Sequence, residues 1–170
     1  ILSGIPLLFE EKGLRLKQRV HGGGAMIRSV QIKDAGQIRD LCHQALGYDS
    51  PLEKVEAQID KFNQPDSRHF CFVYEEEQTG HILGYVEAEV YESLYSDAGL
   101  NILGLAVFPS AQGRGIGRQL MERVEDLAKS KQSAFIRLNS ASHRKEAHLF
   151  YERIGYEGNK TQKRFLKIMN

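Results

Sequence analysis

The most informative residues of the chain are 107–118, which read Val107-Phe108-Pro109-Ser110-Ala111-Gln112-Gly113-Arg114-Gly115-Ile116-Gly117-Arg118. An apolar segment, Leu100–Phe108, stops at Pro109, as a buried strand does. Apolar residues then recur every three or four positions from Ile116, which predicts a helix to about Ser130. The chain therefore passes from a strand through a glycine-rich loop directly into a helix.

This loop has the composition of a phosphate site. Glycines at 113, 115 and 117 let backbone N–H groups approach a ligand closely. The start of the helix adds free donors and partial positive charge. Arg114 and Arg118 add two cationic side chains. The pattern predicts a pyrophosphate-binding loop.

Two nucleotide-binding motifs fit the loop less well. A Walker A loop ends in Gly-Lys-Ser/Thr, whereas this one ends in Gly-Ile-Gly-Arg. A dinucleotide fingerprint of the form G-x-G-x-x-G lacks its third glycine here. A nucleotide-binding domain therefore stays open as a weaker hypothesis. The plain alternative is a glycine-rich turn that only permits tight packing.

Strand and helix patterns alternate along the rest of the chain. The predicted strands are Met26–Gln31, Arg68–Glu75, His81–Tyr91, Leu100–Phe108, Ala134–Leu138, one near Tyr156, and Arg164–Met169. The other predicted helices are Ala35–Leu46 (capped by Asp34, ended by Gly47), one from Ser50 at its cap and Pro51 to about Phe62, and one through Ala147, Phe150, Tyr151 and Ile154, ended by Gly155. Hairpins predict antiparallel pairing and crossover helices parallel pairing. We expect an α/β fold whose mixed, mostly antiparallel central sheet carries helices on both faces.

Composition narrows the class of protein. The chain has 170 residues, a net charge of +1 and 41% hydrophobic residues, which suits one globular domain with no strong pull toward nucleic acid. No apolar run approaches the roughly 20 residues of a membrane span. Cys42 and Cys71 lie far apart without a CxxC partner, so we expect a reduced cytoplasmic protein. Residues 1–25 are expected to be a non-native or disordered leader, and residues 26–170 a single domain.

Several polar groups are not expected to have a functional role. His69 with Cys71, and Cys42 with His43, do not reach a four-ligand metal site, so no metal is expected. The basic residues near the end of the chain are interpreted as protection of an edge strand. They are Lys160, Lys163, Arg164 and Lys167.

Two segments resemble one family. Gln112-Gly113-Arg114-Gly115-Ile116-Gly117 is similar to the Q/R-x-x-G-x-G/A signature of the GNAT acetyltransferases, and residues 147–156 (A-H-L-F-Y-E-R-I-G-Y) resemble its A-x-x-F-Y-E-x-x-G-F/Y segment. The resemblance extends from Met26 to the C-terminus. It implies the GNAT-like acyl-CoA acyltransferase fold, with acetyl-CoA as co-substrate.

The resemblance also implies a set of cofactor contacts. Acetyl-CoA would lie between the splayed strands Leu100–Phe108 and Ala134–Leu138, with the Val107 amide on the thioester oxygen. Residues implied to bind the cofactor are Leu105, Ala106, Val107, Gln112, Gly113, Arg114, Gly115, Ile116, Gly117, Arg118, Asn139, Ser140 and Arg144. Arg144 stands where many relatives have Asn, and it would reach the phosphates or lie in water.

The implied catalytic residues are less uniform. Tyr151 matches the family tyrosine that protonates the departing thiolate, with a core position as the alternative. Some members use a glutamate base where this chain has Asn101. Glu87 and Glu89 are the candidates instead, because residues two apart in a strand face one side of the sheet. Solvated strand positions, or a water chain as base, remain the alternatives.

The sequence thus predicts an N-acetyltransferase that moves an acetyl group to a primary amine of a small molecule or peptide by direct attack in a ternary complex. The alternative is a non-catalytic acyl-CoA-binding sensor with the same fold. Neither nucleic acid nor a membrane is an expected partner, while homodimers are common in the family. Candidate acceptor contacts are Tyr48, Asp49, Tyr91, Glu92, Tyr95 and Asp97.

Overall fold

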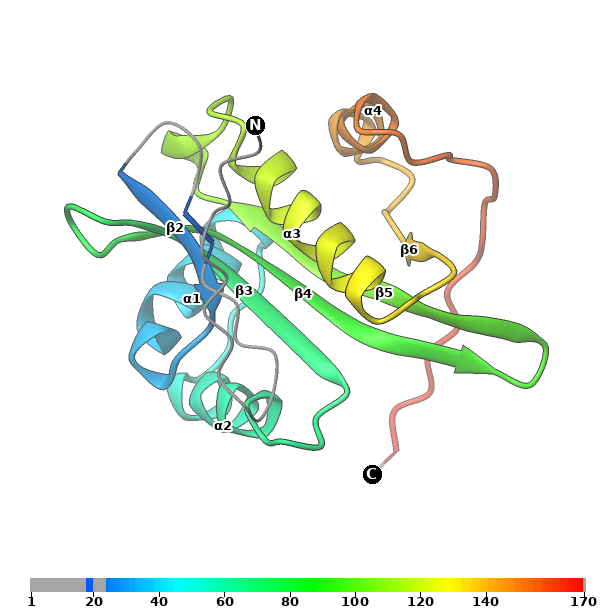
Figure 1. Cartoon of the computed structure of the whole chain (residues 1–170), viewed down its shortest axis with the longest axis horizontal. Helices are drawn as coiled ribbons and strands as arrows, with labels where there is room; N and C mark the ends of the chain where they lie inside the picture. The colour runs from blue at the N-terminus through cyan, green and yellow to red at the C-terminus, as the bar shows by residue number, and fades with distance from the viewer. Residues whose placement is uncertain (1–17, 20–23, 170) are drawn as a thin grey trace, which may run out of the picture. The chain divides into compact units, whose positions relative to one another are not determined.

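The computed structural model describes residues 18–19 and 24–169 (Figure 1). The chain divides into two compact units, residues 1–138 and residues 139–170. The first unit holds the sheet and three α-helices, and the second holds the last helix and the C-terminal segment.

The first unit is built on a six-stranded sheet whose strands lie side by side in chain order. Neighbouring strands pair antiparallel, except for the last two, which are parallel. The strands are β1 (Gln18–Arg19), β2 (Ala25–Ser29), β3 (His69–Glu76), β4 (Ile82–Ser93), β5 (Ser96–Val107) and β6 (Ile136–Leu138). The expected mixed, mostly antiparallel sheet is confirmed. Of the expected leader, residues 18–19 form β1, whereas residues 1–17 and 20–23 lie outside the described residues.

Helices connect these strands at the predicted places. They are η1 (Ile32–Asp34), α1 (Ala35–Leu41), η2 (Cys42–Leu46), α2 (Leu52–Phe62), η3 (Pro109–Ala111), α3 (Ile116–Ser130) and α4 (Lys145–Arg153). Gly47 and Gly155 follow two of them with positive φ, as helix-ending glycines do. None of the helices in the described part of the chain has the length and apolar character that crossing a bilayer requires.

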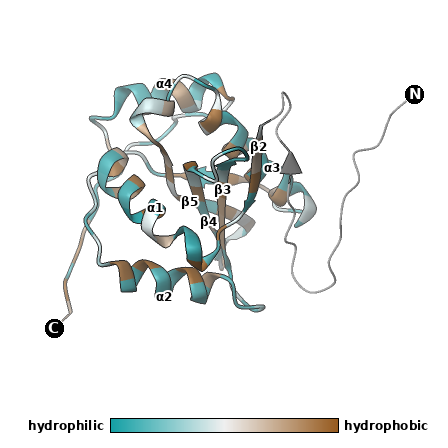
Figure 2. Ribbon diagram, turned by 90° about the vertical axis from the view of Figure 1, so that its left-hand side faces the viewer, coloured by the Kyte–Doolittle hydropathy of each residue, from teal (hydrophilic) through white to brown (hydrophobic). Residues whose placement is uncertain are grey.

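The helices of the first unit cover both faces of the sheet (Figure 1). On one face, α1 and α2 pack against Val73, Tyr85 and Ala106. Gly84 points to the opposite face, where a Cβ would lie 3.2 Å from Leu120 of α3 and 2.9 Å from the Ala106 carbonyl oxygen. Only glycine fits there, which lets the start of α3 pack closely on the sheet. In Figure 2, hydrophobic and hydrophilic residues alternate along α2, as expected for a helix with one apolar side.

Two predicted helix caps differ from the structure. The Asp34 carboxylate does not cap α1; it is buried, accepts a hydrogen bond from the Gln31 N–H (2.8 Å) and pairs with Arg28 (2.7 Å). Arg28 also pairs with Glu75, so this buried cation has two carboxylate partners. Ser50 is not the cap of α2 either, because Pro51 occupies that position and the helix begins at Leu52.

The second unit contains α4 but neither of the two strands predicted after it. Residues 156–169 have no regular secondary structure, so the predictions of a strand near Tyr156 and of a strand at Arg164–Met169 are wrong. Their apolar side chains are largely exposed, as Phe165 is at 90%. A strand needs a neighbour for its N–H and C=O groups, and the described residues provide none for this segment.

Candidate functional site

The glycine loop, residues 112–118, joins η3 to the start of α3. Gly113 and Gly115 have φ of +78° and +76°, in the left-handed region that glycine adopts without strain. Gly115 is the N-cap, and the first N–H to bond within the helix is that of Gln119, to the Gly115 carbonyl (3.1 Å). The N–H groups of the preceding helical residues, 116–118, therefore have no acceptor within the helix. This end of α3 offers a cluster of backbone donors to an anion.

Two arginines border the glycine loop. Arg114 lies 3.6 Å from the Glu76 carboxylate, and Arg118 bonds to Glu122 one turn further along α3 (2.9 Å). The side chains of both arginines are more than half exposed, at 53% and 67%. Surface pairs of this kind are weak, so a phosphate ligand could compete for either guanidinium.

Strand β5 leads into the loop with one edge unpaired. Its parallel ladder with β6 ends at the pair Ile102–Leu138. Opposite β4 the register shifts, since Glu87 pairs with Gly104 but Ala88 pairs with Ile102. This bulge bends the strand locally. Because β6 ends at Leu138, residues 103–107 of β5 have no ladder partner on the β6 side, among the described strands.

Backbone groups along this edge point in a defined direction. The Phe108 N–H donates to the Leu83 carbonyl, across from β4 (2.9 Å). The backbone N–H groups of successive strand residues alternate in direction. The N–H of Ala106 therefore faces β4, as that of Phe108 does, whereas the N–H groups of Val107 and Leu105 point away from β4. The Val107 carbonyl lies on the same outer edge and accepts a bond from the Gln112 side chain (3.3 Å). The outer edge of β5 thus continues into the glycine loop.

A second group of polar residues lies across β3, β4 and β5, and we call it the polar cluster: His69, Glu87, Glu89 and Asn101. Glu89 is paired across the strands with both His69 and Asn101, so these side chains share one face of the sheet. The Asn101 amide donates to the Glu89 carboxylate (2.9 Å). Burial, and secondarily the charge of Glu89, raise the pKa of Glu87 above its usual range.

His69 belongs to this cluster, although the sequence indicated no role for it beyond an incomplete metal site. Its ring stacks flat on Phe62, the last residue of α2, with centroids 4.5 Å apart. Its Nδ1 lies 4.0 Å from the Glu87 carboxylate. Only the strand register brings the two together, and a single sequence does not specify register.

The two cysteines are free thiols near this cluster. Cys42 Sγ lies 3.3 Å from the Tyr85 hydroxyl. Burial raises the pKa of Cys71 well above its usual range and also raises that of Cys42, which keeps both thiols protonated and poorly nucleophilic. No group of three or more metal-ligating side chains gathers in the part of the chain that was described.

The second unit carries the remaining predicted residues. Tyr151 lies on α4, with its ring against Phe150 (5.1 Å) and Tyr156 (6.2 Å). Burial raises the pKa of Tyr151, while the charge of Arg144 acts to lower it. No hydrogen bond to the Tyr151 hydroxyl is found within the described residues. Arg144 is the N-cap of α4, and Asn139 and Ser140 precede that helix.

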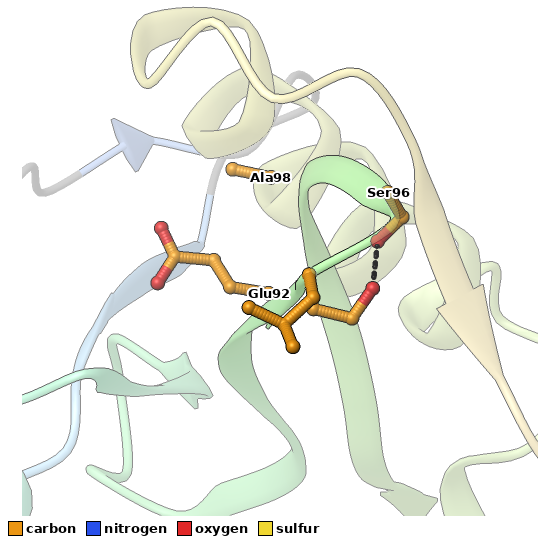
Figure 3. A pocket seen from close by; sticks show the side chains of 5 residues that line it. Glu92, Ser96 and Ala98 are labelled. Carbon is orange, nitrogen blue, oxygen red and sulfur yellow. Dashed lines mark hydrogen bonds between the residues drawn. The ribbon is translucent and has the colours of Figure 1, made fainter.

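An open hollow of about 540 Å³ lies at the tip of the β4–β5 hairpin (Figure 3). Its lining residues are Glu92, Ser93, Leu94, Ser96 and Ala98. The serine hydroxyls bond to each other (2.7 Å), and Glu92 pairs with Arg68 (2.6 Å). The hollow is formed by the hairpin tip alone, so we do not assign the site to it.

Among the predicted acceptor contacts, Tyr48 and Tyr95 are exposed, and Tyr91 packs under Arg137 (4.7 Å).

The model of the Acetyltransferase (GNAT) family matches residues 34–156. This range includes the glycine loop, the polar cluster and Tyr151. Among curated protein sequences, no match to the chain is found.

Solved structures of the same fold cover nearly the whole chain. A transcriptional regulator from Bacillus halodurans C-125 is 20% identical, with a TM-score of 0.73, covering 84% of this chain and 99% of its own. The aminoglycoside acetyltransferase AAC(6')-Iy, in complex with a CoA-containing bisubstrate analogue, is 18% identical, with a TM-score of 0.74 and coverage of 86% and 100%. Glucosamine-6-phosphate N-acetyltransferase from Arabidopsis thaliana is 18% identical, with a TM-score of 0.69 and coverage of 84% and 97%. Together with the family match, which spans most of the sequence, this fold shows that the chain belongs to the GNAT family of acetyltransferases.

Proposed function

We propose that this protein is an N-acetyltransferase that moves an acetyl group from acetyl-CoA to a primary amine of a small molecule or peptide, by direct attack in a ternary complex. The observation that carries the proposal is the continuity between the unpaired edge of β5 and the glycine loop. A linear ligand with an amide-containing arm and a pyrophosphate matches these two features in order. Similarity to the AAC(6')-Iy complex supports CoA as that ligand.

In this proposal, the pantetheine arm bonds to the outward backbone of Leu105 and Val107. The pyrophosphate binds the amides of residues 112–118, helped by Arg114 and Arg118. The Val107 N–H then faces the thioester oxygen and stabilises the negative charge that develops as the amine attacks. Asn139, Ser140 and Arg144 are proposed as further cofactor contacts from the second unit.

The acceptor amine must lose a proton before its lone pair can attack the thioester carbon. Glu87 is the proposed base, with Glu89 beside it. A raised pKa suits a carboxylate for this task because a stronger base accepts the proton more readily. Glu89 is oriented by Asn101, so it is better placed to attract the cationic amine than to move protons. Tyr151 is the proposed acid for the departing thiolate.

The substrate class follows from the charge of the polar cluster. Two carboxylates on a partly buried sheet face favour a cationic acceptor. The names of two structural neighbours mention amine-bearing sugars, which fits an amine acceptor of small size.

Calorimetry tests whether acetyl-CoA binds at the glycine loop, by comparing the wild type with Gly117→Trp. The bulky side chain in the first turn of α3 should abolish binding. Gly36→Trp is the matched control, because nothing lies within 4 Å of a Cβ at that helical glycine. Thiol release with a panel of amines then tests turnover. A wild type that does not bind acetyl-CoA would contradict the proposal.

A second candidate is a non-catalytic acyl-CoA sensor. The observation that favours it is Asn101, which stands where some relatives have a glutamate base and bonds to Glu89. One structural neighbour is named as a transcriptional regulator, which fits this alternative. Tight binding of acetyl-CoA without acetylation of any amine would support the sensor over the enzyme.

A further inference from the structure

His69 and Glu87 form an unusual contact within the polar cluster. The imidazole Nδ1 and the Glu87 carboxylate are 4.0 Å apart, which is too far for a hydrogen bond. Nδ1 is buried and has no hydrogen-bond partner among residues 18–19 and 24–169. No hydrogen bond to the Glu87 carboxylate is found in the described residues either. Nδ1 and the Glu87 carboxylate therefore face each other, and neither is bonded to another described group.

The surroundings hold this pair in place. The His69 ring is fixed by its flat stack on Phe62, and the Glu89 carboxylate is already bonded by Asn101. Glu87 is thus the carboxylate of the cluster that remains available. The side chains of His69 and Glu87 are 29% and 25% exposed, so the pair is within reach of a ligand.

A purely structural role explains this arrangement poorly. A buried imidazole nitrogen without a partner costs free energy, and packing alone would be served as well by an apolar residue. A metal site needs a third ligand, and no such group of three is found among the described residues.

We propose that His69 and Glu87 act together as the base of the acetyl transfer, with His69 Nδ1 as the final acceptor of the proton. This inference rests on the proposed function and deepens it. The acceptor ammonium lies against Glu87, which takes one proton from it. As the Glu87 side chain rotates to close the 4.0 Å gap to Nδ1, that proton passes to His69, and Glu87 is restored as a carboxylate.

The acetyl transfer itself forms one bond and breaks another. The amine lone pair forms the N–C bond to the acetyl group, the C–S bond breaks, and the thiolate leaves. Tyr151 gives its hydroxyl proton to that thiolate, forming the free thiol, and is reprotonated by the second proton that the amine releases. The proton on His69 returns to solvent. The other titratable groups around the pair are Glu89 on β4, Cys71 on β3, Tyr85 on β4 and Cys42 at the end of α1.

The test is the rate of thiol release by His69→Ala, His69→Gln and the wild type, over a pH series, with and without added imidazole. We expect His69→Ala to lose about a hundredfold in kcat with little change in KM for the amine. Imidazole should restore part of the rate of His69→Ala, more so at higher pH, because it fills the space beside Phe62. His69→Gln should remain slow, since its amide cannot accept a proton. His81→Ala is the matched control, because His81 is an exposed histidine in the turn between β3 and β4, at the far end of β3 from His69.

Acetyl-CoA binding by calorimetry shows whether each variant is folded. A His69→Ala variant that keeps the wild-type rate, or a His69→Gln variant that restores it, would overturn the role of His69 while leaving the proposed function intact. A wild type that acetylates no amine would overturn the proposed function and this inference together. The two failures differ because the first requires an active wild type.

Discussion

The glycine loop and the polar cluster are built in opposite ways. The loop presents mainly backbone: glycines with positive φ, free N–H groups at the start of α3, and the outer edge of β5. The cluster presents side chains from three strands and depends on their register. A backbone site binds a feature that many ligands share, whereas a side-chain site can be changed one residue at a time. Under the proposed function, the loop serves the common cofactor and the cluster serves this protein's own acceptor.

The largest effect that separates the two regions is expected for Glu87→Gln. Removing the carboxylate should lower kcat by about a hundredfold or more, because the base is lost. The affinity for acetyl-CoA should stay unchanged, as measured by calorimetry. Glu53→Gln, at an exposed position in the first turn of α2, is the control. Equal loss of cofactor affinity would mean that the cluster and the loop are not separate sites.

The converse change is Gly115→Val. A β-branched residue at a φ of +76° is strained by about 1–2 kcal/mol, and relief of that strain would move the loop amides. We expect acetyl-CoA affinity to fall about tenfold, with kcat at saturating cofactor changed little. Gly158→Val is the control, since φ at that glycine is not positive and the nearest atom to a Cβ is 3.7 Å away. Unaltered affinity in Gly115→Val would argue against the loop as the phosphate site.

Tyr151→Phe tests the second unit. Loss of the acid should lower kcat about tenfold, because a thiolate leaves fairly well without help. Burial raises the pKa of Tyr151, so its hydroxyl stays protonated through neutral pH and the wild-type rate should fall only at alkaline pH. The pH profile of Tyr151→Phe should lack that alkaline decrease. A variant as active as the wild type at all pH values would assign Tyr151 to packing.

A smaller effect is expected for Arg118→Ala. Its guanidinium is exposed and already bonded to Glu122, so its loss should weaken acetyl-CoA binding only a few-fold. The difference from the wild type should shrink as salt is added, because salt screens an exposed charge. Titrations at two ionic strengths measure this. A loss that does not depend on salt would point to packing by the side chain instead.

The smallest effect concerns stability. The pKa of Glu87 is raised in the folded protein above its ordinary value of 4.5, so the folded state binds a proton more readily than the unfolded state does. Stability should therefore decrease as pH rises from about that value through the raised pKa. Glu87→Gln should melt a few degrees higher than the wild type near neutral pH and equally in acid, by thermal melts over a pH series. A lower melting temperature at neutral pH would mean that the charge of Glu87 has a stabilising partner.

Much of the fold was predictable because its signals are local. The helix from Ile116 to Ser130, the hairpin strands and the helix-ending Gly47 and Gly155 all follow from periodicity and from glycine's freedom at positive φ. The two C-terminal strands were wrong because a strand pattern describes half of a pair and does not supply the other half. Asp34 was misassigned because its partner, Arg28, is brought near it by tertiary packing.

In the candidate site, too, local features could be predicted from the sequence and contacts between strands could not. The glycine loop could be predicted, because its donors come from consecutive residues. The contact between His69 and Glu87 could not, because it depends on the pairing of β3 with β4. Alternation placed Glu87 and Glu89 on one face, but it gave no indication that Asn101 would bond to Glu89 or that Glu87 would lie beside an imidazole.

The short ladder between β5 and β6 has a consequence for handling the protein. Residues 103–107 of β5 have no partner strand on the β6 side in the described residues, and an unpaired strand edge is a template on which another chain can add a strand. A ligand bonded along this edge would occupy that template. Concentrated preparations without such a ligand are therefore the ones in which intermolecular strand addition, and with it loss of soluble protein, should begin.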